Sequence, residues 1–171
     1  ELFAEDTESD YTWSENSDGT VTITKYTGTE TEITVPSELN GKTVVTIGSN
    51  AFANNTNLVK IELNEGLKTI GSYAFEDCMS LEEIRLPDSV TNVGYRAFYN
   101  DKNLKTVNYP KNCTGSGTNT YYGNVFEGCT SLETVAPSLF IFASVAGLIP
   151  AFAARSLLLI ARSSSNLNSL L

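Results

Sequence analysis

Apolar side chains in the centre of the chain recur at a fixed spacing. Residues 61–81 and residues 84–104 carry the same pattern, and most apolar positions of the first segment are repeated 23 residues later. Repeats of about 20–29 residues are typical of solenoids, in which one unit is too small to bury its apolar side chains alone and therefore stacks on its neighbours. The pattern predicts one elongated domain of stacked coils.

The repeat extends in both directions from this centre. Residues 33–58 form an earlier copy that is lengthened by five residues around Asn40-Gly41-Lys42. Residues 107–132 form a later copy that carries a comparable insertion at residues 114–120, and a fifth copy begins at Val135. We therefore assign residues 33–135 to repeats of about 23 residues.

Each repeat begins with a strand pattern. Ile84 and Leu86 alternate with Glu83 and Arg85, as expected for a short strand with one buried face. Pro87 follows, and it ends the strand because proline has no N–H to donate to a neighbouring strand. These repeated strands are predicted to pair side by side as a parallel sheet.

The rest of the repeat predicts a second strand and a turn. Residues 90–93 form a short extended segment, and residues 95–99 predict a helical or 3₁₀ turn. The glycine between them is expected to relieve crowding between backbones. A phenylalanine in each turn is expected to join one buried stack of rings, which comprises Phe52, Phe75, Phe98 and Phe126.

The N-terminal part of the chain predicts a cap. Residues 11–32 contain Asp18-Gly19 between alternating β-branched residues, which is a strong signal of a β-hairpin. Such a hairpin would cover the open edge of the first coil, with Trp13 lying over that edge. Residues 1–10 are acidic and predict a flexible tail.

The C-terminal part, residues 136–171, departs from the repeat and is strongly apolar up to Ile160. One interpretation is a divergent cap or tail on the last coil. A membrane-associated segment is less favoured, because the apolar run before Arg155 is only 16 residues and contains Pro150, whereas a span needs about 20. A shifted reading frame or a cloning remnant would also explain the abrupt change. The chain starts at Glu1 without an initiator methionine, as in a mature chain or a fragment, so any targeting signal lies outside it.

Charge and composition exclude several classes of function. The 171 residues include 20 Asp and Glu against 11 Lys and Arg, which argues against nucleic acid as a partner. Histidine is absent, so the commonest general base and metal ligand is missing. No nucleophile motif, metal-binding motif or phosphate-binding glycine loop is present in the sequence. We expect no catalytic residue, no metal and no cofactor.

Two of the three cysteines occupy equivalent positions of their repeats. Cys78 and Cys129 lie two coils apart, or roughly 9.6 Å in a stack of strands, which is too far for a disulfide. We expect both to be buried thiols. Asn55 and Asp101 hold the same position in other copies, which indicates a place where small polar side chains bond to loop backbone. Cys113 lies beside the insertion and is expected to be exposed.

Three spaced motifs carry a resemblance to a known family. They are Leu81-x-x-Ile84-x-Leu86-Pro87, Val90-x-x-Val93-Gly94-x-x-Ala97-Phe98 and Cys78-x-Ser80-Leu81. The chain resembles the BspA-like leucine-rich-repeat surface proteins over residues 11–135. This resemblance implies an α/β fold, a right-handed leucine-rich-repeat solenoid. It also implies a secreted or cell-surface protein, and some proteins of this family are adhesins for host matrix proteins.

The outward positions of the strands provide the candidate binding face. It comprises Lys60, Glu62, Glu83, Arg85, Thr106 and Asn108, with Tyr121 and Tyr122 beside the insertion. These side chains either contact solvent only or bind a protein ligand, since curved solenoids often present such a face. The two function hypotheses are an adhesin-like module that binds a host or matrix protein, and a structural spacer with no ligand of its own.

Overall fold

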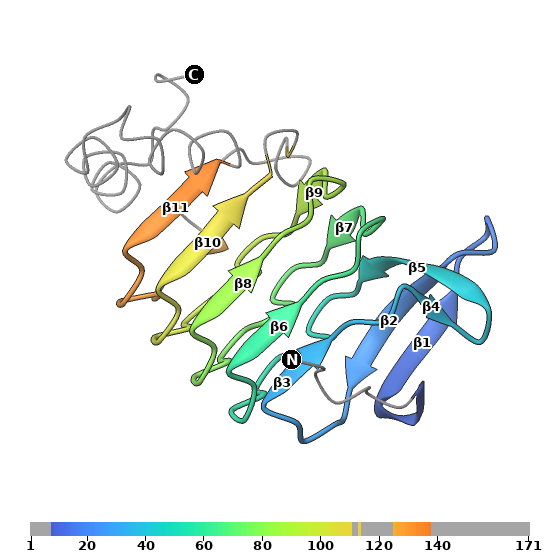
Figure 1. Cartoon of the computed structure of the whole chain (residues 1–171), viewed down its shortest axis with the longest axis horizontal. Helices are drawn as coiled ribbons and strands as arrows, with labels where there is room; N and C mark the ends of the chain where they lie inside the picture. The colour runs from blue at the N-terminus through green and yellow to red at the C-terminus, as the bar shows by residue number, and fades with distance from the viewer. Residues whose placement is uncertain (1–7, 111–112, 114–124, 138–171) are drawn as a thin grey trace.

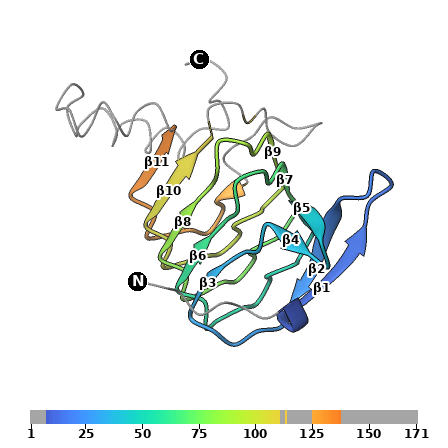
Figure 2. The ribbon, with the colours of Figure 1, turned by 45° about the vertical axis from the view of Figure 1, so that its right-hand side comes forward.

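The chain folds as a stack of coils around one apolar core (Figure 1). The computed structural model describes residues 8–110, 113 and 125–137. We name each coil after its first strand. The coils of β3 (Glu32–Thr34), β6 (Lys60–Glu62), β8 (Glu83–Arg85) and β10 (Thr106–Tyr109) follow one another along the stack. Two sheets form opposite sides of the coils, and Figure 2 shows them facing each other across the core.

One sheet consists entirely of parallel strands. Their order is β11-β10-β8-β6-β3, which is the reverse of the chain order and places consecutive coils side by side. The registers align Ile33 with Ile61, Ile84 and Val107, so these buried side chains form one row. The strands are β3 (Glu32–Thr34), β6 (Lys60–Glu62), β8 (Glu83–Arg85), β10 (Thr106–Tyr109) and β11 (Thr134–Pro137). This row confirms the predicted repeat register.

The second sheet includes the predicted hairpin. Strands β1 and β2 pair antiparallel, and β2 then pairs parallel to β5, so the hairpin extends the solenoid and covers its first coil. Trp13 is half-buried against the core, as predicted for a capping side chain. The strands are β1 (Tyr11–Glu15), β2 (Val21–Tyr26), β5 (Lys42–Ile47), β7 (Thr69–Ile70) and β9 (Asn92–Val93), and β4 (Glu38–Leu39) pairs antiparallel to β5.

The third side of the coils is a series of turns. The backbone N–H groups of Ala97 and Tyr99 donate to the carbonyls three residues earlier, at 3.3 and 3.0 Å, which is the 3₁₀ pattern. Helices do not form at residues 48–55, 71–78 and 94–101. The reason is that residues such as Arg96 and Asn100, with φ of +50° and +62°, interrupt the negative φ values that a right-handed helix requires. The described chain is therefore mostly strand and turn.

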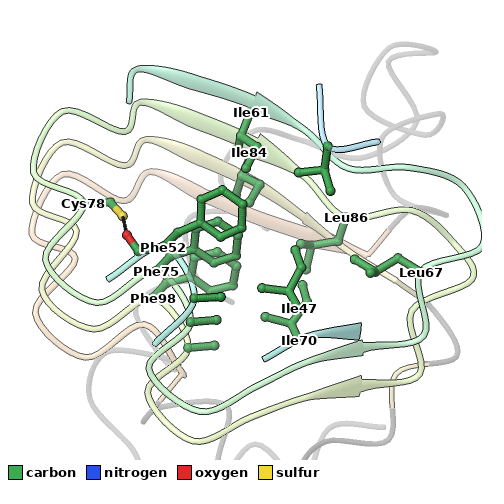
Figure 3. Packing of buried hydrophobic residues seen from close by; sticks show 14 of the residues in the cluster. Ile47, Phe52, Ile61, Leu67, Ile70, Phe75, Cys78, Ile84, Leu86 and Phe98 are labelled. Carbon is green, nitrogen blue, oxygen red and sulfur yellow. Dashed lines mark hydrogen bonds between the residues drawn. The ribbon is translucent and has the colours of Figure 1, made fainter. Parts of the chain in front are cut away.

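Aromatic rings form the predicted stack inside the turns. Phe75 lies 5.1 Å from Phe52 and 5.2 Å from Phe98 between ring centroids, with interplanar angles of 16° and 4° (Figure 3). Phe126 continues the stack at 5.4 Å from Phe98. At the other end Tyr26 lies 5.2 Å from Phe52, so the hairpin cap supplies a further ring to the column.

Glycines bring the backbones of adjacent coils close together. The N–H of Gly71 donates to Ile47 O at 2.8 Å. A Cβ at Gly71 would lie only 2.5 Å from Ser49 N, and one at Gly94 would lie 2.4 Å from Ser72 N. These contacts confirm that the glycines relieve crowding, because any side chain would collide with backbone.

The two ends of the chain lie partly outside the described residues. Of the segment expected as a tail, Glu8–Asp10 form the 3₁₀ turn η1, and Thr27 N donates to Asp10 O at 2.8 Å. The predictions for residues 1–7 and 138–171 concern residues that the structure does not describe. Within the described ranges, no helix has the length and apolar character that crossing a membrane requires.

Candidate functional site

The parallel sheet aligns the predicted binding face in two columns. Lys60, Glu83 and Thr106 occupy one register position, and Glu62 and Arg85 share the next outward position. Lys60 is half-buried and the other four are exposed, and Lys60 lies 3.9 Å from Glu62 in a surface ion pair. We call these five residues the sheet ribbon.

Two charged residues at the centre of the ribbon are available to a ligand. Glu83 and Arg85 are exposed and have no ion-pair partner among the residues the structure describes. The neighbouring Lys105 Nζ, by contrast, lies 2.8 Å from Glu82 Oε2. Surface pairs of this kind stabilise a fold by only about 0–1 kcal/mol, so the charges on this face are not required for folding.

Asn108 does not belong to the binding face, and its prediction is wrong. It aligns with Arg85 but is 8% exposed. Its Oδ1 accepts from Leu86 N at 2.8 Å, and its Nδ2 donates to Leu86 O at 2.9 Å. Because Leu86 lies just beyond the end of β8, the amide of Asn108 satisfies backbone groups where the strand pairing has ended. The alternation of strand side chains alone could not reveal this bond, which joins two neighbouring coils.

The remaining predictions for this face have different outcomes. Tyr121 and Tyr122 lie outside the described residues. Glu32 and Thr34 of β3 are exposed and align with Lys60 and Glu62, so the columns extend one coil further than predicted. The same offset from Ile33 could have identified them in the sequence.

The cysteine positions bond to backbone as predicted. Cys78 Sγ donates to Phe52 O at 3.2 Å (Figure 3). Cys129 Sγ donates to Phe98 O at 2.9 Å. Burial raises the pKa of the Cys78 thiol, which therefore stays protonated. The prediction that Cys113 is exposed is wrong, because its backbone N–H bonds to Pro110 O and its side chain joins the core at 6% exposure.

Asp101 is a buried carboxyl at the equivalent position. Its Oδ1 accepts from Cys78 N at 2.8 Å, whereas its Oδ2 is buried without a hydrogen-bond partner among the described residues. Desolvation by burial raises the pKa of Asp101 from 3.8 to about 8. Between these pH values the folded chain holds a proton on Asp101 that the unfolded chain releases. The folded chain therefore becomes less stable, through this group, as the pH rises from about 4 towards 8.

Replacing this carboxyl should change how stability depends on pH. When the pH is raised from 5 to 9, we expect the free energy of unfolding of Asp101→Asn to increase by about 1–3 kcal/mol relative to that of the parent, because the amide carries no charge to desolvate. Urea denaturation at both pH values measures this gain. Asp88→Asn, which removes a carboxyl at an exposed position, serves as the matched control. An equal response of Asp101→Asn and its parent at both pH values would contradict the role of Asp101.

A cluster of tyrosines and one arginine lies on the turn side of the solenoid. Arg96 makes two bonds to Glu127, from Nε at 2.8 Å and from Nη2 at 2.9 Å. Its guanidinium carbon lies 4.7 Å from the ring centroid of Tyr99 and 5.1 Å from that of Tyr95. Tyr73 meets Tyr95 edge to face at 5.6 Å. We call Tyr73, Tyr95, Arg96 and Tyr99 the turn-face cluster.

Electrostatics and exposure distinguish this cluster from the core. The hydrogen bond to the Glu127 carboxylate raises the pKa of Arg96, which keeps the guanidinium charged. Tyr95 is 38% exposed, and among the described residues it is the one large apolar side chain that lies exposed to solvent. The sequence does not reveal this cluster, because the repeat pattern assigns roles to buried positions and leaves the outward positions of the turn undefined.

Backbone strain accompanies two members of the cluster. Tyr73 and Arg96 have φ of +58° and +50°, in the left-handed region that favours glycine and asparagine. The equivalent residue of the preceding coil is Asn50, with φ of +58°. Non-glycine residues held in this region carry strain of roughly 1–3 kcal/mol, and such strain tends to occur at functional sites.

The repeat family is shown by a comparison with family models. Residues 24–139 match the BspA type leucine rich repeat region, described with six copies. The chain belongs to this family. The resemblance seen in the sequence is thereby confirmed, and so is the fold class of a leucine-rich-repeat solenoid.

Solved structures with the same fold come from bacteria. A leucine-rich repeat protein of T. pallidum is 25% identical with a TM-score of 0.60, and the match covers 77% of this chain and 70% of that chain. A leucine-rich repeat protein of Bacteroides capillosus is 24% identical with a TM-score of 0.63, over 75% of this chain and 94% of that one. The pneumococcal vaccine antigen PcpA is 29% identical with a TM-score of 0.58, over 74% of this chain and 30% of that one. A comparison with curated proteins returned no match.

Proposed function

We propose that this chain is an extracellular or cell-surface module that binds a protein ligand, as an adhesin does, and that it has no catalytic activity. The observation that carries this proposal is the sheet ribbon, in which Glu83 and Arg85 stand exposed and without an ion-pair partner among the described residues of a parallel sheet. Membership of a repeat family whose solenoids present ligand-binding surfaces supports it. A vaccine antigen among the similar structures supports a location accessible from outside the cell.

The chemistry of the chain supports a role in binding rather than catalysis. The full sequence contains no histidine, so nucleophilic catalysis would lack its usual base. The net charge of −9 disfavours nucleic acid as the ligand and favours a protein with a complementary basic surface. A host or matrix protein with such a surface is the ligand class we propose.

The size of the ribbon limits how tightly it can bind. The whole parallel sheet, of which the ribbon is the central part, has five strands at about 4.8 Å spacing and is therefore roughly 24 Å long, so its outer face amounts to a few hundred Å². A stable interface uses about 800 Å² from each partner. The sheet ribbon alone should therefore bind weakly. The described part of the ribbon also lacks aromatic side chains, and this favours the second candidate function, a structural spacer without a ligand.

Charge reversal on the ribbon distinguishes the two candidates. The double variant Glu83→Lys/Arg85→Glu is compared with the parent on a panel of purified extracellular matrix proteins. We expect it to bind about tenfold more weakly to any protein that the parent captures, because like charges would then face each other at the interface. Surface plasmon resonance measures the binding. The free energy of unfolding should change by less than about 0.5 kcal/mol, since both side chains are exposed.

A second charge swap provides the matched control. Lys25→Glu/Glu38→Lys also preserves net charge and changes exposed positions on strands β2 and β4, away from the ribbon, so binding should stay at the level of the parent. Equal loss of binding in both double variants would show that the sheet ribbon is not the contact surface. If the parent captures no matrix protein, the spacer function is favoured instead.

A further inference from the structure

The turn-face cluster carries large side chains where an equivalent coil carries small ones. Tyr95, Arg96 and Tyr99 of the β8 coil occupy the positions of Ser49, Asn50 and Ala53 in the β3 coil. Both turns are closed by the same backbone bonds: Ala51 N to Gly48 O and Ala97 N to Gly94 O both measure 3.3 Å. The backbone therefore closes equally well with small residues, and the fold does not require the aromatic rings at this place.

Backbone strain at Tyr73 and Arg96 also indicates a role other than folding. The left-handed backbone at this turn position suits Asn50, but Tyr73 and Arg96 adopt it in the next two coils. A tyrosine and an arginine at such positions oppose local stability, so their presence calls for another role. Both side chains extend into the same cluster, where Tyr73 meets Tyr95 and Arg96 lies over Tyr95.

The cluster has the composition of a protein contact surface. Tyrosine and arginine are enriched among residues that contribute most to binding energy at interfaces. Here the rings are already held by one another and by the Arg96–Glu127 bond, so few side-chain rotamers would be lost on association. The sheet ribbon, in contrast, lacks aromatic side chains within the described strands.

Charges around the cluster indicate the kind of partner. The charge of Arg96 is neutralised by Glu127, and the adjoining turn adds Glu76 and Asp77. Asp77 N donates to Tyr99 O at 2.9 Å, so the turn that carries Glu76 and Asp77 lies against the turn that carries Tyr99. Asp77 Oδ1 accepts from Asn100 Nδ2, whereas Glu76 is half-buried. Lysine and arginine side chains bind both carboxylates and the faces of tyrosine rings.

We propose that the turn-face cluster is a docking surface for a basic segment of a partner protein. This inference rests on the proposed function in one respect, that the ligand is a protein, and it assigns a second surface separate from the sheet ribbon. Two contact surfaces on one solenoid would offset the small area of the ribbon, since linked weak sites bind together more tightly than either alone.

Selection from a random peptide display library tests the surface directly. Peptides of about twelve residues would be selected on the immobilised full chain, and the enriched peptides compared on Tyr73→Asn/Tyr95→Ser, which installs residues found at equivalent positions of earlier coils. We expect enriched peptides rich in lysine and arginine that bind the double variant at least about tenfold more weakly. The thermal midpoint of the variant should stay within about 3 °C of the parent, because the backbone strain at residue 73 is relieved.

Two further variants make the result decisive. Glu76→Lys places a like charge beside the cluster and should weaken the same peptides by at least about threefold without removing an aromatic ring. Glu83→Lys/Arg85→Glu should leave these peptides bound as tightly as by the parent, although it weakens matrix-protein capture if the proposed function holds.

Several outcomes would overturn the docking surface. They are the absence of peptides that distinguish the parent from Tyr73→Asn/Tyr95→Ser, enrichment of acidic peptides, and binding to a neutral oligosaccharide array where no peptide is bound. A fall of more than about 3 °C in the midpoint of Tyr73→Asn/Tyr95→Ser, with Glu76→Lys still binding normally, would assign the tyrosines to packing instead. Peptide binding lost only in the sheet-ribbon variant would reject this surface and leave the proposed function intact.

Discussion

Truncating Phe75 to alanine should destabilise the chain by about 3–5 kcal/mol, because its ring fills the middle of the aromatic column and is fully buried. The ring stacks on Phe52 and Phe98 at 5.1 and 5.2 Å, so its removal leaves a cavity between two coils. Those coils are fixed by hydrogen bonds at 2.8 Å from Phe52 N to Ala74 O and from Phe75 N to Ala97 O, which limits collapse into the cavity. Urea denaturation followed by circular dichroism measures the loss.

An aromatic residue outside the column serves as the control for Phe75. Tyr95→Ala removes a ring that is 38% exposed, and it should change the free energy of unfolding by less than about 1 kcal/mol. Were Phe75→Ala no more destabilising than Tyr95→Ala, the stacked column would not be the main support of these coils.

Adding one methyl group at Gly71 should be nearly as damaging as removing a whole ring. The Cβ of Gly71→Ala would lie 2.5 Å from Ser49 N and 2.7 Å from Gly48 C, and backbone atoms of a neighbouring coil cannot rotate away as a side chain can. We expect a loss of about 3 kcal/mol, at the upper end for overpacked sites, because the two coils must separate where Gly71 N bonds to Ile47 O. A fall in the thermal midpoint of roughly 6–12 °C would follow in a domain of this size.

A glycine of a different kind isolates this steric effect. Gly41 has φ of +70°, and among the described residues no atom lies within 4 Å of the place that a Cβ would take. The backbone conformation, rather than a lack of space, therefore favours glycine at this position. Asparagine tolerates such backbone, and Gly41→Asn should be close to neutral. If Gly71→Ala matched Gly41→Asn in stability, close contact between the coils would not be the reason for the glycine.

The sequence was sufficient to predict the parts of the fold that repeat. A 23-residue spacing determines which side chains must share an environment, and it correctly placed Ile61 beside Ile84 and Phe75 between Phe52 and Phe98. The Asp18-Gly19 signal was equally sufficient for the hairpin, because such turns are determined locally.

Features that differ from one coil to the next were harder to predict. Asn108 follows the outward alternation of its strand but is buried by bonds to Leu86, a contact between residues 22 positions apart. Cys113 was misplaced because the insertion beside it has no counterpart of the same sequence in other coils.

The turns do carry a recurring signal that sequence analysis could have used. Asn54, Asp77 and Asn100 all adopt left-handed backbone and are residue types that tolerate it. That signal shows where the turn cannot continue as a helix. It does not predict the strain at Arg96, because arginine has no preference for left-handed backbone.

The buried thiols of Cys78 and Cys129 give the chain two native probes of local opening. They lie in equivalent positions of coils two steps apart, and each is covered by the same kind of bond to a phenylalanine carbonyl. A thiol reagent can modify either sulfur only when the coil around it separates from its neighbour. The relative labelling rates of the two cysteines under native conditions would therefore reveal the direction in which the stack unravels, without any engineered label.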